Sequence, residues 1–461
     1  MKKISKKNIL ITLLAIAFLT RFGLFLIFKP WLPNIQNEVV LLYDAVGYNN
    51  LALILLDTFR MKNEILRTPV YPAFIASIYA VVGVKPFIVL FVQIFISVAT
   101  AYFFYKIAEY LTNTMIAQTG LFIFAVEPTL ILYTSFLYSE VLFMFFTMLS
   151  LFWLLKGLKN NENKWFILSG ITLGLATLTR PAGQYLIVVY ALLILFYTTQ
   201  KKLRIKNTVI LACFFFLSIF PWTMRNYVLY NRFILSNTMD HNALILSSFY
   251  TEFRNSPLPR DTIINNFLKQ VKEAAPENLK DEMPTNLAEL NTRQSFEHTD
   301  VFAKVAKNYL LSHKKEFLLA QIQGAINLHI NMGTEQFMLR LHQETERWDI
   351  KDKVGLGTIS IAKKFFATKT IVEISLGLFI LFILGMIYFC AAIGFYFSIR
   401  QKNFYLLFFC LINIAYYVAL SSIYPTPRFR NPFIPFYILL ASYGIYYLYP
   451  KLFRKKLDKQ I

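Results

Sequence analysis

The sequence has few charged residues and few cysteines, and each shortage excludes a class of protein. Asp, Glu, Lys and Arg make up 16% of the 461 residues, whereas they make up about 25% of an average soluble domain. Hydrophobic residues reach 56% and the mean hydropathy is +0.49, which is too apolar for a water-exposed surface. The 16 glycines and 17 prolines are too few for a linker or a fibrous protein. All three cysteines lie within apolar runs, so no structural disulfide is expected.

The motifs of several common catalytic machineries are missing as well. The five histidines are scattered without an HExxH pattern or paired-ligand spacing, so no zinc site can be recognised. The motifs GxxxxGK[ST] and GxGxxG are absent, which argues against a protein driven by nucleotide binding in the cytoplasm. No serine stands in the GxSxG motif of hydrolases. The sequence therefore identifies no cofactor with certainty. It leaves open a divalent metal, for which it shows no cluster of ligands.

Long runs without a charge dominate the chain instead. Most of them approach or exceed the ~18 apolar residues that indicate a membrane span. They comprise residues 141–155, 165–179, 207–224, 404–427 and 431–450. We therefore expect an all-α polytopic membrane protein, with a first helix that is retained because no small-residue cleavage site follows its apolar run.

The basic excess is concentrated in short segments, which gives the orientation of the chain. The net charge is +21. Five short segments hold 18 Lys/Arg and two acids, namely residues 1–8, 156–164, 201–206, 400–402 and 451–461. Residues 225–369, in contrast, are nearly balanced, with 19 Lys/Arg and 16 acids. Excess Lys/Arg in short loops marks the cytoplasmic side of a membrane, so we interpret the charge as a topology signal rather than as a nucleic-acid site.

Ten spans satisfy these side assignments. We expect them at about 8–30, 86–109, 113–133, 137–157, 164–180, 182–199, 206–223, 370–398, 403–422 and 431–450. Both termini are then cytoplasmic, in a multi-pass plasma-membrane protein whose active site faces the extracytoplasmic side. The 13-residue run 70–82 is too short to span and is expected to lie in the membrane interface, as is the amphipathic stretch 302–330. The spans on either side of Pro181 should form a tight hairpin.

These spans predict three domains. Residues 1–224 would form an N-terminal transmembrane catalytic module that includes the first outer loop, 31–69. Residues 225–369 would form an α-helical extracytoplasmic domain, partly interfacial, and residues 370–461 would form the C-terminal transmembrane helices.

The first outer loop carries the densest set of candidate functional residues. Asp44, Tyr48 and Ala52 share one helical face through their i, i+4, i+8 spacing. A carboxylate beside a tyrosine at the membrane surface could accept the proton of a hydroxyl group. The alternative is an acid at a helix N-terminus, where the macrodipole favours it.

Outer-face arginines indicate an anionic ligand. Arg67 precedes two prolines that fix the backbone, and its planar guanidinium would match phosphate oxygens bidentately. Snorkelling to ordinary lipid headgroups is the alternative. Arg180 lies at the outer turn of the hairpin, and Arg428 and Arg430 lie in a proline-rich outer loop. Basic residues on this side are not needed for topology, so together they indicate an anionic, lipid-facing site.

Further polar residues lie at the ends of the predicted spans. Glu140 enters the fourth span, where a carboxylate is costly and therefore a functional candidate. Arg225 and Trp222 close the seventh span and could also be anchors of the aromatic belt. Arg21 lies inside the first span, where a polar partner elsewhere in the bundle is the simpler interpretation.

The order of these motifs resembles the GT-C membrane glycosyltransferases, specifically glycosyltransferase family 39, which includes protein O-mannosyltransferases and the lipid A aminoarabinose transferase. The motifs are, in order, Asp44 with Tyr48, Arg67-Thr-Pro-Val-Tyr71-Pro, Gln93, Ser139-Glu140, Gly174-Leu-Ala-Thr-Leu-Thr-Arg180-Pro, Pro221-Trp-Thr-Met-Arg225-Asn-Tyr and Pro427-Arg-Phe-Arg430. The resemblance covers residues 1–230 and the last spans, whereas residues 235–300 match no pattern of the family.

The resemblance implies a GT-C-type helical bundle and an inverting transfer of a sugar from a polyprenyl-phosphate donor to a hydroxyl of a lipid, cell-surface glycan or protein. It implies Asp44 and Glu140 as catalytic carboxylates and Arg67 and Arg180 as the cations on the donor phosphate. The remaining candidate substrate-binding residues are Tyr48, Tyr71, Arg225, Arg428 and Arg430. One departure concerns Ala45, because protein O-mannosyltransferases have an Asp-Glu pair at this point. A lipid or glycan acceptor is therefore at least as well supported as a protein.

Two other functions use the same features. A transporter or flippase of a lipid-linked or anionic solute would need the basic cavity without the chemistry of Asp44, and a glycan polymerase or ligase would also need outer arginines. Transporters usually show repeat symmetry between their halves. No internal repeat is visible in this sequence, which argues against the first of these alternatives.

Overall fold

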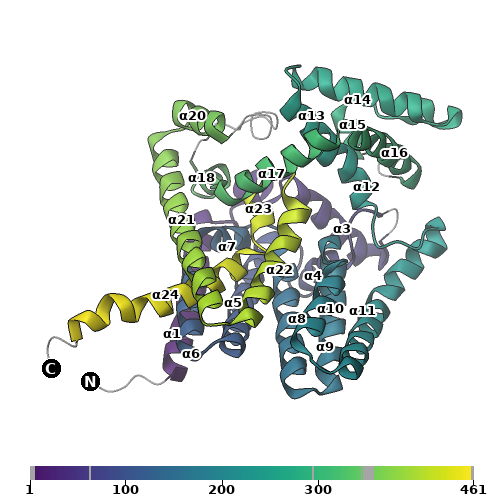
Figure 1. Ribbon diagram of the computed structural model, residues 1–461. Helices are drawn as coiled ribbons and strands as arrows, with labels where there is room; N and C mark the ends of the chain where they lie inside the picture. The colour runs from purple at the N-terminus through teal and green to yellow at the C-terminus, as the bar shows by residue number, and fades with distance from the viewer. Residues whose placement is uncertain (1–5, 62–63, 293–294, 344, 346–357, 458–461) are drawn as a thin grey trace.

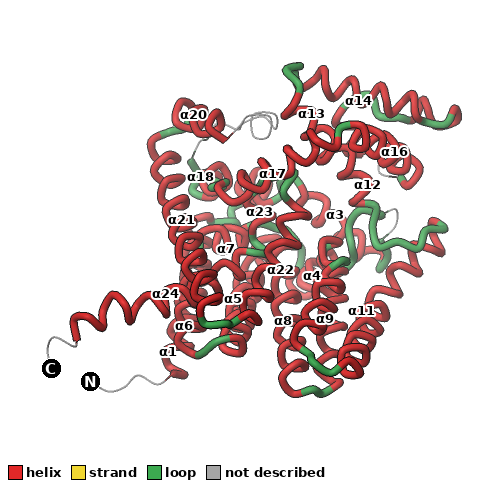
Figure 2. The backbone as a smooth tube through the Cα atoms, in the orientation of Figure 1, coloured by secondary structure: helices red, strands yellow, loops and turns green. Residues whose placement is uncertain are grey.

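The computed structural model describes residues 6–61, 64–292, 295–343, 345 and 358–457, and within these ranges it contains helices and no strand (Figure 1, Figure 2). The predicted all-α architecture is therefore confirmed. The first half of the chain forms α1 (Lys6–Phe28), α2 (Pro33–Ile35), the π-helix η1 (Gln36–Val40), α3 (Asp44–Thr58), α4 (Val70–Val82), α5 (Pro86–Leu111), α6 (Thr114–Val126), α7 (Pro128–Leu132), η2 (Tyr133–Ser135), α8 (Glu140–Asn160), α9 (Asn163–Thr179), η3 (Pro181–Gly183), α10 (Leu186–Tyr197) and α11 (Lys201–Tyr230).

The second half is also helical. It forms α12 (Thr238–Asn242), the π-helix η4 (Ala243–Ser248), α13 (Phe249–Asn255), α14 (Arg260–Ala274), η5 (Glu277–Glu282), α15 (Leu287–Thr292), α16 (Phe296–Ser312), α17 (Lys314–Ile330), α18 (Thr334–Arg340), α20 (Thr358–Thr368), α21 (Ile371–Arg400), α22 (Phe404–Ser421), α23 (Pro427–Arg430) and α24 (Ile434–Leu457).

Six helices in the described part of the chain are long and apolar enough to cross a membrane, namely α1, α5, α8, α11, α21 and α22. Two bent helix pairs raise the number to eight if each pair is one span. The chain is thus a multi-pass membrane protein. The predicted count of ten is not confirmed, because α9 has 17 residues, α10 has 12 and the apolar part of α24 is also shorter than 18.

Local sequence signals explain several helix ends. Glu127 ends α6 and caps α7, accepting a hydrogen bond from the backbone N–H of Leu130 at 2.6 Å, while Pro128 takes the first position of α7. The two helices are bent by 57° at this point. The break predicted at Pro181 is confirmed, since α9 ends at Thr179 and a short 3₁₀ turn begins at the proline.

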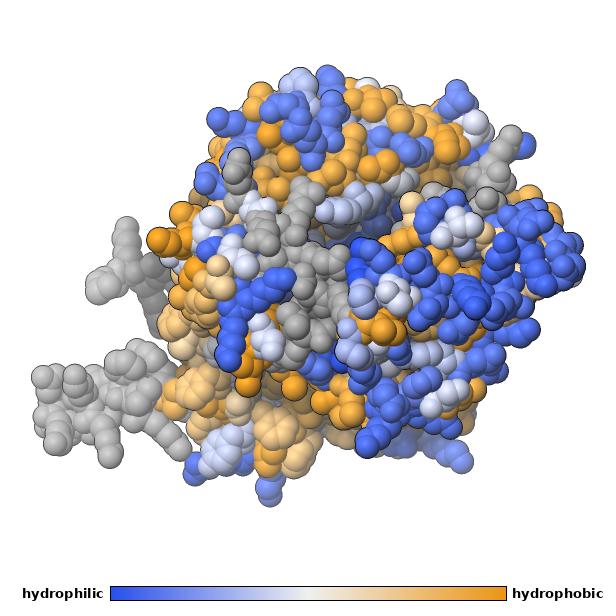
Figure 3. Space-filling view, turned by 90° about the horizontal axis from the view of Figure 1, so that it is seen from above, coloured by the Kyte–Doolittle hydropathy of each residue, from blue (hydrophilic) through white to orange (hydrophobic). Residues whose placement is uncertain are grey.

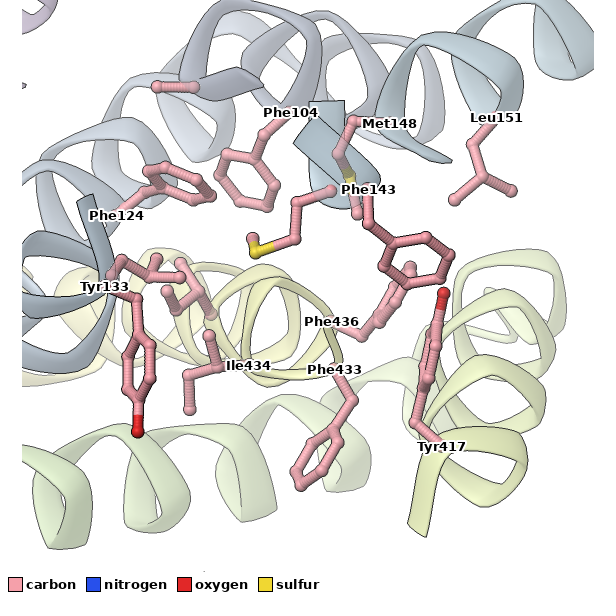
Figure 4. Packing of buried hydrophobic residues seen from close by; sticks show 14 of the residues in the cluster. Phe104, Phe124, Tyr133, Phe143, Met148, Leu151, Tyr417, Phe433, Ile434 and Phe436 are labelled. Atoms are coloured by element: carbon pink, nitrogen blue, oxygen red, sulfur yellow. The ribbon is translucent and has the colours of Figure 1, made fainter. Parts of the chain in front are cut away.

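Small residues bring the membrane helices into close contact. A Cβ atom on Gly394 of α21 would lie 1.9 Å from the carbonyl oxygen of Leu440 in α24, so only glycine allows this approach. Aromatic side chains fill the space between α5, α6, α8, α22 and α24 (Figure 4). Phe143 and Tyr417, for example, meet edge to face with ring centroids 6.4 Å apart.

The helices from α12 to α16 share a buried apolar cluster of their own, formed around Phe249, Phe267 and Phe302. They lie at the top of Figure 1, over the end of the bundle that is remote from the start of α1. The following helix, α17, leaves an apolar stripe exposed, comprising Leu318, Leu319, Ile322, Ile326 and Ile330. This stripe fits the predicted interfacial position of the helix.

The predicted outer loop 31–69, called the first outer segment below, is tied to the chain that follows α11. Two side-chain hydroxyls, of Ser236 and Thr238, each donate to the carbonyl oxygen of Leu66 at 2.7 Å. The backbone N–H of Asn237 donates to the carbonyl oxygen of Ile65 at 2.8 Å. These bonds fix the backbone immediately before Arg67.

Candidate active site

A cavity of about 1330 Å³ opens among the helix ends that carry Asp44 and Arg428. Several separate parts of the chain form its wall. They are the start of α3, the η2 region, the turn at Pro181, α12, α18, α20 and the segment around α23. The face above it carries many hydrophilic residues around a hollow near its centre (Figure 3). Of the residues predicted from the sequence, the cavity is lined by Asp44, Tyr48, Arg67, Arg180 and Arg428.

Two carboxylates share one arginine at the centre of this site. Arg428 donates from Nη1 to Asp44 Oδ2 at 2.5 Å and from Nε to Glu140 Oε1. Arg180 donates to the same Glu140 oxygen. The Glu140 side chain is only 1% exposed and does not line the cavity, whereas the Asp44 side chain is 43% exposed. Asp44 therefore faces the cavity. Glu140 lies behind the cavity wall, where it binds both Arg180 and Arg428.

Arg67 occupies the other side of Asp44. Its Nη2 lies 3.7 Å from Asp44 Oδ1, and its Nη1 lies 3.9 Å from Glu64 Oε2. The guanidinium also lies over the ring of Tyr48 at 5.4 Å. Gly47 makes this position available, because a Cβ atom there would come within 2.5 Å of Arg67 Nη2.

The cations determine the protonation of Asp44. Burial raises the pKa of its carboxyl group, but Arg428, Arg67 and Arg180 together outweigh burial and lower that pKa below its ordinary value. Asp44 is therefore ionised at neutral pH. In Arg428, burial lowers the pKa and the two carboxylates raise it well above its ordinary value.

Several predicted residues lie outside the cavity wall and have other partners. The buried hydroxyl of Tyr71 donates to Gln93 Oε1 at 2.7 Å. Arg225 donates to the carbonyl oxygens of Met61 and Glu64 and so holds the first outer segment. Arg430 is fully buried and donates to the carbonyl oxygens of Leu328, His329 and Asn331. Arg225 and Arg430 therefore lie apart from Asp44. Tyr71 lies behind the cavity wall, where its ring meets that of Tyr48 edge to face with centroids 4.8 Å apart.

Arg21 has the simpler role that was expected. It is fully buried and donates to Ser97 Oγ at 2.8 Å and to the carbonyl oxygen of Ala125 at 3.0 Å. It thus joins α1 to α5 and α6 inside the bundle.

Two cavity residues have no signal in the sequence. Tyr138 lies under the Arg428 guanidinium at 4.4 Å, and Arg340 lines the cavity from the end of α18. Arg340 comes from a stretch with many charges, in which no motif distinguishes it. Among the residues that the structure describes, no group of three His, Cys, Asp or Glu could hold a metal ion.

Comparison with known proteins places this site in a recognised fold. Residues 66–224 match the family model of the dolichyl-phosphate-mannose-protein mannosyltransferases. The structure is similar to that of the archaeal oligosaccharyltransferase AglB from Archaeoglobus fulgidus, with a TM-score of 0.53 and 14% identity over 99% of this chain and 52% of that chain. The chain has a GT-C fold. The resemblance expected from its motifs is thereby confirmed.

Other GT-C structures match more weakly. The Pmt1–Pmt2 complex of S. cerevisiae matches with a TM-score of 0.39 and 14% identity, over 56% of this chain and 38% of that chain. ArnT from Cupriavidus metallidurans matches with a TM-score of 0.38 and 11% identity, over 94% of this chain and 77% of that chain. This chain spans about half the length of AglB. No curated protein matches it significantly in sequence.

Proposed function

We propose that this GT-C chain is an inverting glycosyltransferase, which moves a sugar from a polyprenyl-phosphate-linked donor to a hydroxyl acceptor at the extracytoplasmic face of the membrane. The observation that carries the proposal is the placement of Asp44. It is an ionised carboxylate, partly exposed to a cavity of about 1330 Å³ and fixed by Arg428 and Arg67.

The proposed reaction needs one base on the acceptor side. The acceptor oxygen attacks the anomeric carbon of the sugar, the bond from that carbon to the phosphate oxygen breaks, and Asp44 takes the hydroxyl proton. The lowered pKa of Asp44 makes it a weak base, so we expect the proton to move late, when the attacking oxygen has become acidic. The polyprenyl phosphate leaves with its electron pair as a monoester.

The positive charge around Asp44 suits an anionic donor. Arg67, Arg180 and Arg428 line the same cavity, and all three also contact carboxylates. They can therefore stabilise charge that develops on the leaving phosphate, at a position where water is partly excluded. Glu140 is the proposed positioning residue, since it holds Arg180 and Arg428 in place.

The comparisons support the class of donor. The matching family model is named for dolichyl-phosphate-mannose as the donor, and AglB was seen with a dolichol-phosphate. We propose a polyprenyl-phosphate-linked sugar as the donor, a lipid, glycan or protein as the acceptor, and membrane lipids as the surroundings. Because Ala45 follows Asp44, a lipid or glycan acceptor remains at least as well supported as a protein.

The decisive experiment separates bond cleavage from transport. The purified chain is reconstituted into vesicles with a polyprenyl-phosphate sugar that is radiolabelled in the sugar. A transferase releases polyprenyl phosphate and moves the label to an acceptor. Movement of the intact donor across the membrane, with no release of the lipid phosphate, would refute the transferase and indicate a flippase. In cells that lack the chain, we expect the lipid-linked donor sugar to accumulate.

A further inference from the structure

Arg340 differs from the other cavity arginines in having no acidic partner among the described residues. Its side chain lines the cavity, yet the residue is only 2% exposed. Nε donates to Ser135 Oγ at 3.3 Å, and the guanidinium lies over the ring of Phe136 at 3.6 Å. Arg67, Arg180 and Arg428, in contrast, all pair with carboxylates.

A buried guanidinium without a counter-charge is unfavourable. Removing a cation from water costs several kcal/mol, and hydrogen bonds or an opposite charge must offset this cost. One neutral hydroxyl and two aromatic rings, those of Phe136 and Phe28, offset only part of it. Burial lowers the pKa of Arg340 to about 10, so the group is still cationic at neutral pH. An anion bound in the cavity would supply the missing charge.

The position of Arg340 indicates where that anion comes from. Its guanidinium lies 5.2 Å from the ring of Phe28, the last residue of the candidate membrane helix α1. Two residues further on, His342 stacks on the same ring and contacts the carbonyl oxygen of Ile27 at 3.2 Å. Arg340 therefore lies at the end of a membrane helix, which is the depth of lipid phosphates.

Two aromatic rings connect Arg340 to the carboxylate cluster. Phe136 lies under Arg340, Tyr138 lies under Arg428, and the two ring centroids are 4.9 Å apart. Arg428 in turn donates to Asp44. The uncompensated cation and the proposed base thus share one wall of the cavity.

We propose that Arg340 binds the phosphate of the lipid carrier, and that it is the residue that discriminates the spent carrier from the sugar-loaded one. The proposal rests on the proposed function. The sugar-loaded carrier is a phosphodiester with one negative charge, whereas the released carrier is a monoester that approaches two. An uncompensated arginine gains more from the second charge, so it stabilises the leaving group. Arg67 and Arg180, which are already paired with carboxylates, add to the positive field on the phosphate and also keep Asp44 and Glu140 oriented.

Binding of a carrier without a sugar tests this assignment independently of transfer. Undecaprenyl phosphate, undecaprenol and inorganic phosphate are added separately to the full-length protein in nanodiscs, and binding is measured for the wild type, Arg340→Gln, Arg340→Lys and Arg254→Gln. Arg254 is the matched control, because its guanidinium nitrogens are buried without a partner in the described structure but it does not line the cavity.

We expect Arg340→Gln to weaken undecaprenyl phosphate binding at least tenfold and Arg340→Lys to weaken it less, because lysine keeps the charge but loses the planar fork. Undecaprenol binding should not change, and Arg254→Gln should bind like the wild type. Without ligand, the melting temperature of Arg340→Gln should equal or exceed that of the wild type, since an uncompensated charge is removed. A structural role predicts a lower melting temperature instead.

Three outcomes would overturn the assignment. The first is equal undecaprenyl phosphate binding by Arg340→Gln and the wild type. The second is an equal loss in Arg254→Gln. The third is inorganic phosphate binding as tightly as the lipid, which would identify a site for free phosphate. Failure of the proposed function has a different signature: binding would depend on Arg340, but the wild type would release no carrier from a sugar-loaded donor.

Discussion

Arg428 reaches Asp44 across 384 positions of the sequence, with Nη1 2.5 Å from Oδ2. The contact joins the short helix α23, just before α24, to the start of α3. Because the same guanidinium also donates to Glu140 at the start of α8, the proposed base is oriented only when α3, α8 and α23 are assembled. The candidate site is thus a product of the whole bundle.

Replacing the proposed base tests its role directly. Asp44→Asn keeps the side-chain volume but cannot take a proton, so we expect transfer to fall by about 10²–10⁴-fold. Asp57→Asn is the control, because Asp57 is the other aspartate of α3 and does not line the cavity. Turnover is measured with purified protein and donor lipid, and melting temperatures check that both variants fold. Wild-type turnover by Asp44→Asn would refute the assignment.

The pH dependence should reveal the arginines around this carboxylate. Cations lower the pKa of Asp44 below the ordinary value of 3.8, so in the wild type the base stays ionised until the pH falls below that value. Arg428→Gln removes the strongest attractive partner while burial still raises the pKa. The acid limb of kcat/KM should therefore move to higher pH in the variant. An acid limb at the same pH in both proteins would contradict this electrostatic account.

Glu140 should matter for stability as well as for activity. Glu140→Gln leaves Arg180 and Arg428 without their shared carboxylate, and breaking a buried ion pair from one side costs about 3–5 kcal/mol. Glu162→Gln is the matched control, because Glu162 pairs with Lys164 where both side chains are largely exposed and such pairs contribute little to stability. Denaturation in detergent should separate the two variants. Similar free energies of unfolding would argue against the buried pair.

The sequence predicts the positions of the helices better than it predicts which groups the charged side chains contact. Apolar runs and Lys/Arg counts place α4 at Val70–Val82 and the turn at Pro181, where the structure has them. These signals are local, since length and hydropathy decide them. The sequence also selects Asp44 and Arg428, because each stands in a short polar motif.

The group that each arginine contacts depends on long-range packing and could not be predicted from the sequence. Nothing in the motif around Arg225 distinguishes an arginine that holds a loop from one that faces a cavity. Arg340, conversely, reaches the cavity wall only because α18 packs beside Phe28 and Phe136. The predicted count of ten spans is not confirmed, because several apolar helices of the described chain fall just short of the 18-residue criterion.

The orientation of the chain can be tested apart from its chemistry. Cys213 is the exposed native cysteine, so it is first replaced by alanine. Glu277→Cys, in the outer helices, should react with an impermeant thiol reagent added outside cells, because this side chain is 88% exposed. Lys164→Cys, which is 61% exposed, should react only after the membrane is opened. Labelling of position 164 from outside would invert the predicted topology.

Gly47 offers a way to move Arg67 without mutating it. In Gly47→Ala the new Cβ would lie 2.5 Å from Arg67 Nη2, so the flexible guanidinium must shift away from Asp44. Alanine also favours the helix by about 1 kcal/mol over glycine, so α3 should not lose stability. We therefore expect lower turnover without a lower melting temperature. Gly23→Ala is the control, because no atom lies within 4 Å of the added Cβ.

A double-mutant cycle makes the test of Arg67 specific. Arg67→Ala should cost about 2–4 kcal/mol of transition-state stabilisation, on the scale of one oxyanion donor, and Arg67→Lys should fall between alanine and the wild type because lysine loses the bidentate fork. If Gly47→Ala acts only through Arg67, it should have no further effect on kcat/KM once Arg67 is alanine. Additive losses would mean that Gly47 acts through α3 itself. Wild-type turnover by both Arg67 variants would mean that Arg67 does not bind the donor phosphate, and would favour its alternative role of snorkelling to lipid headgroups.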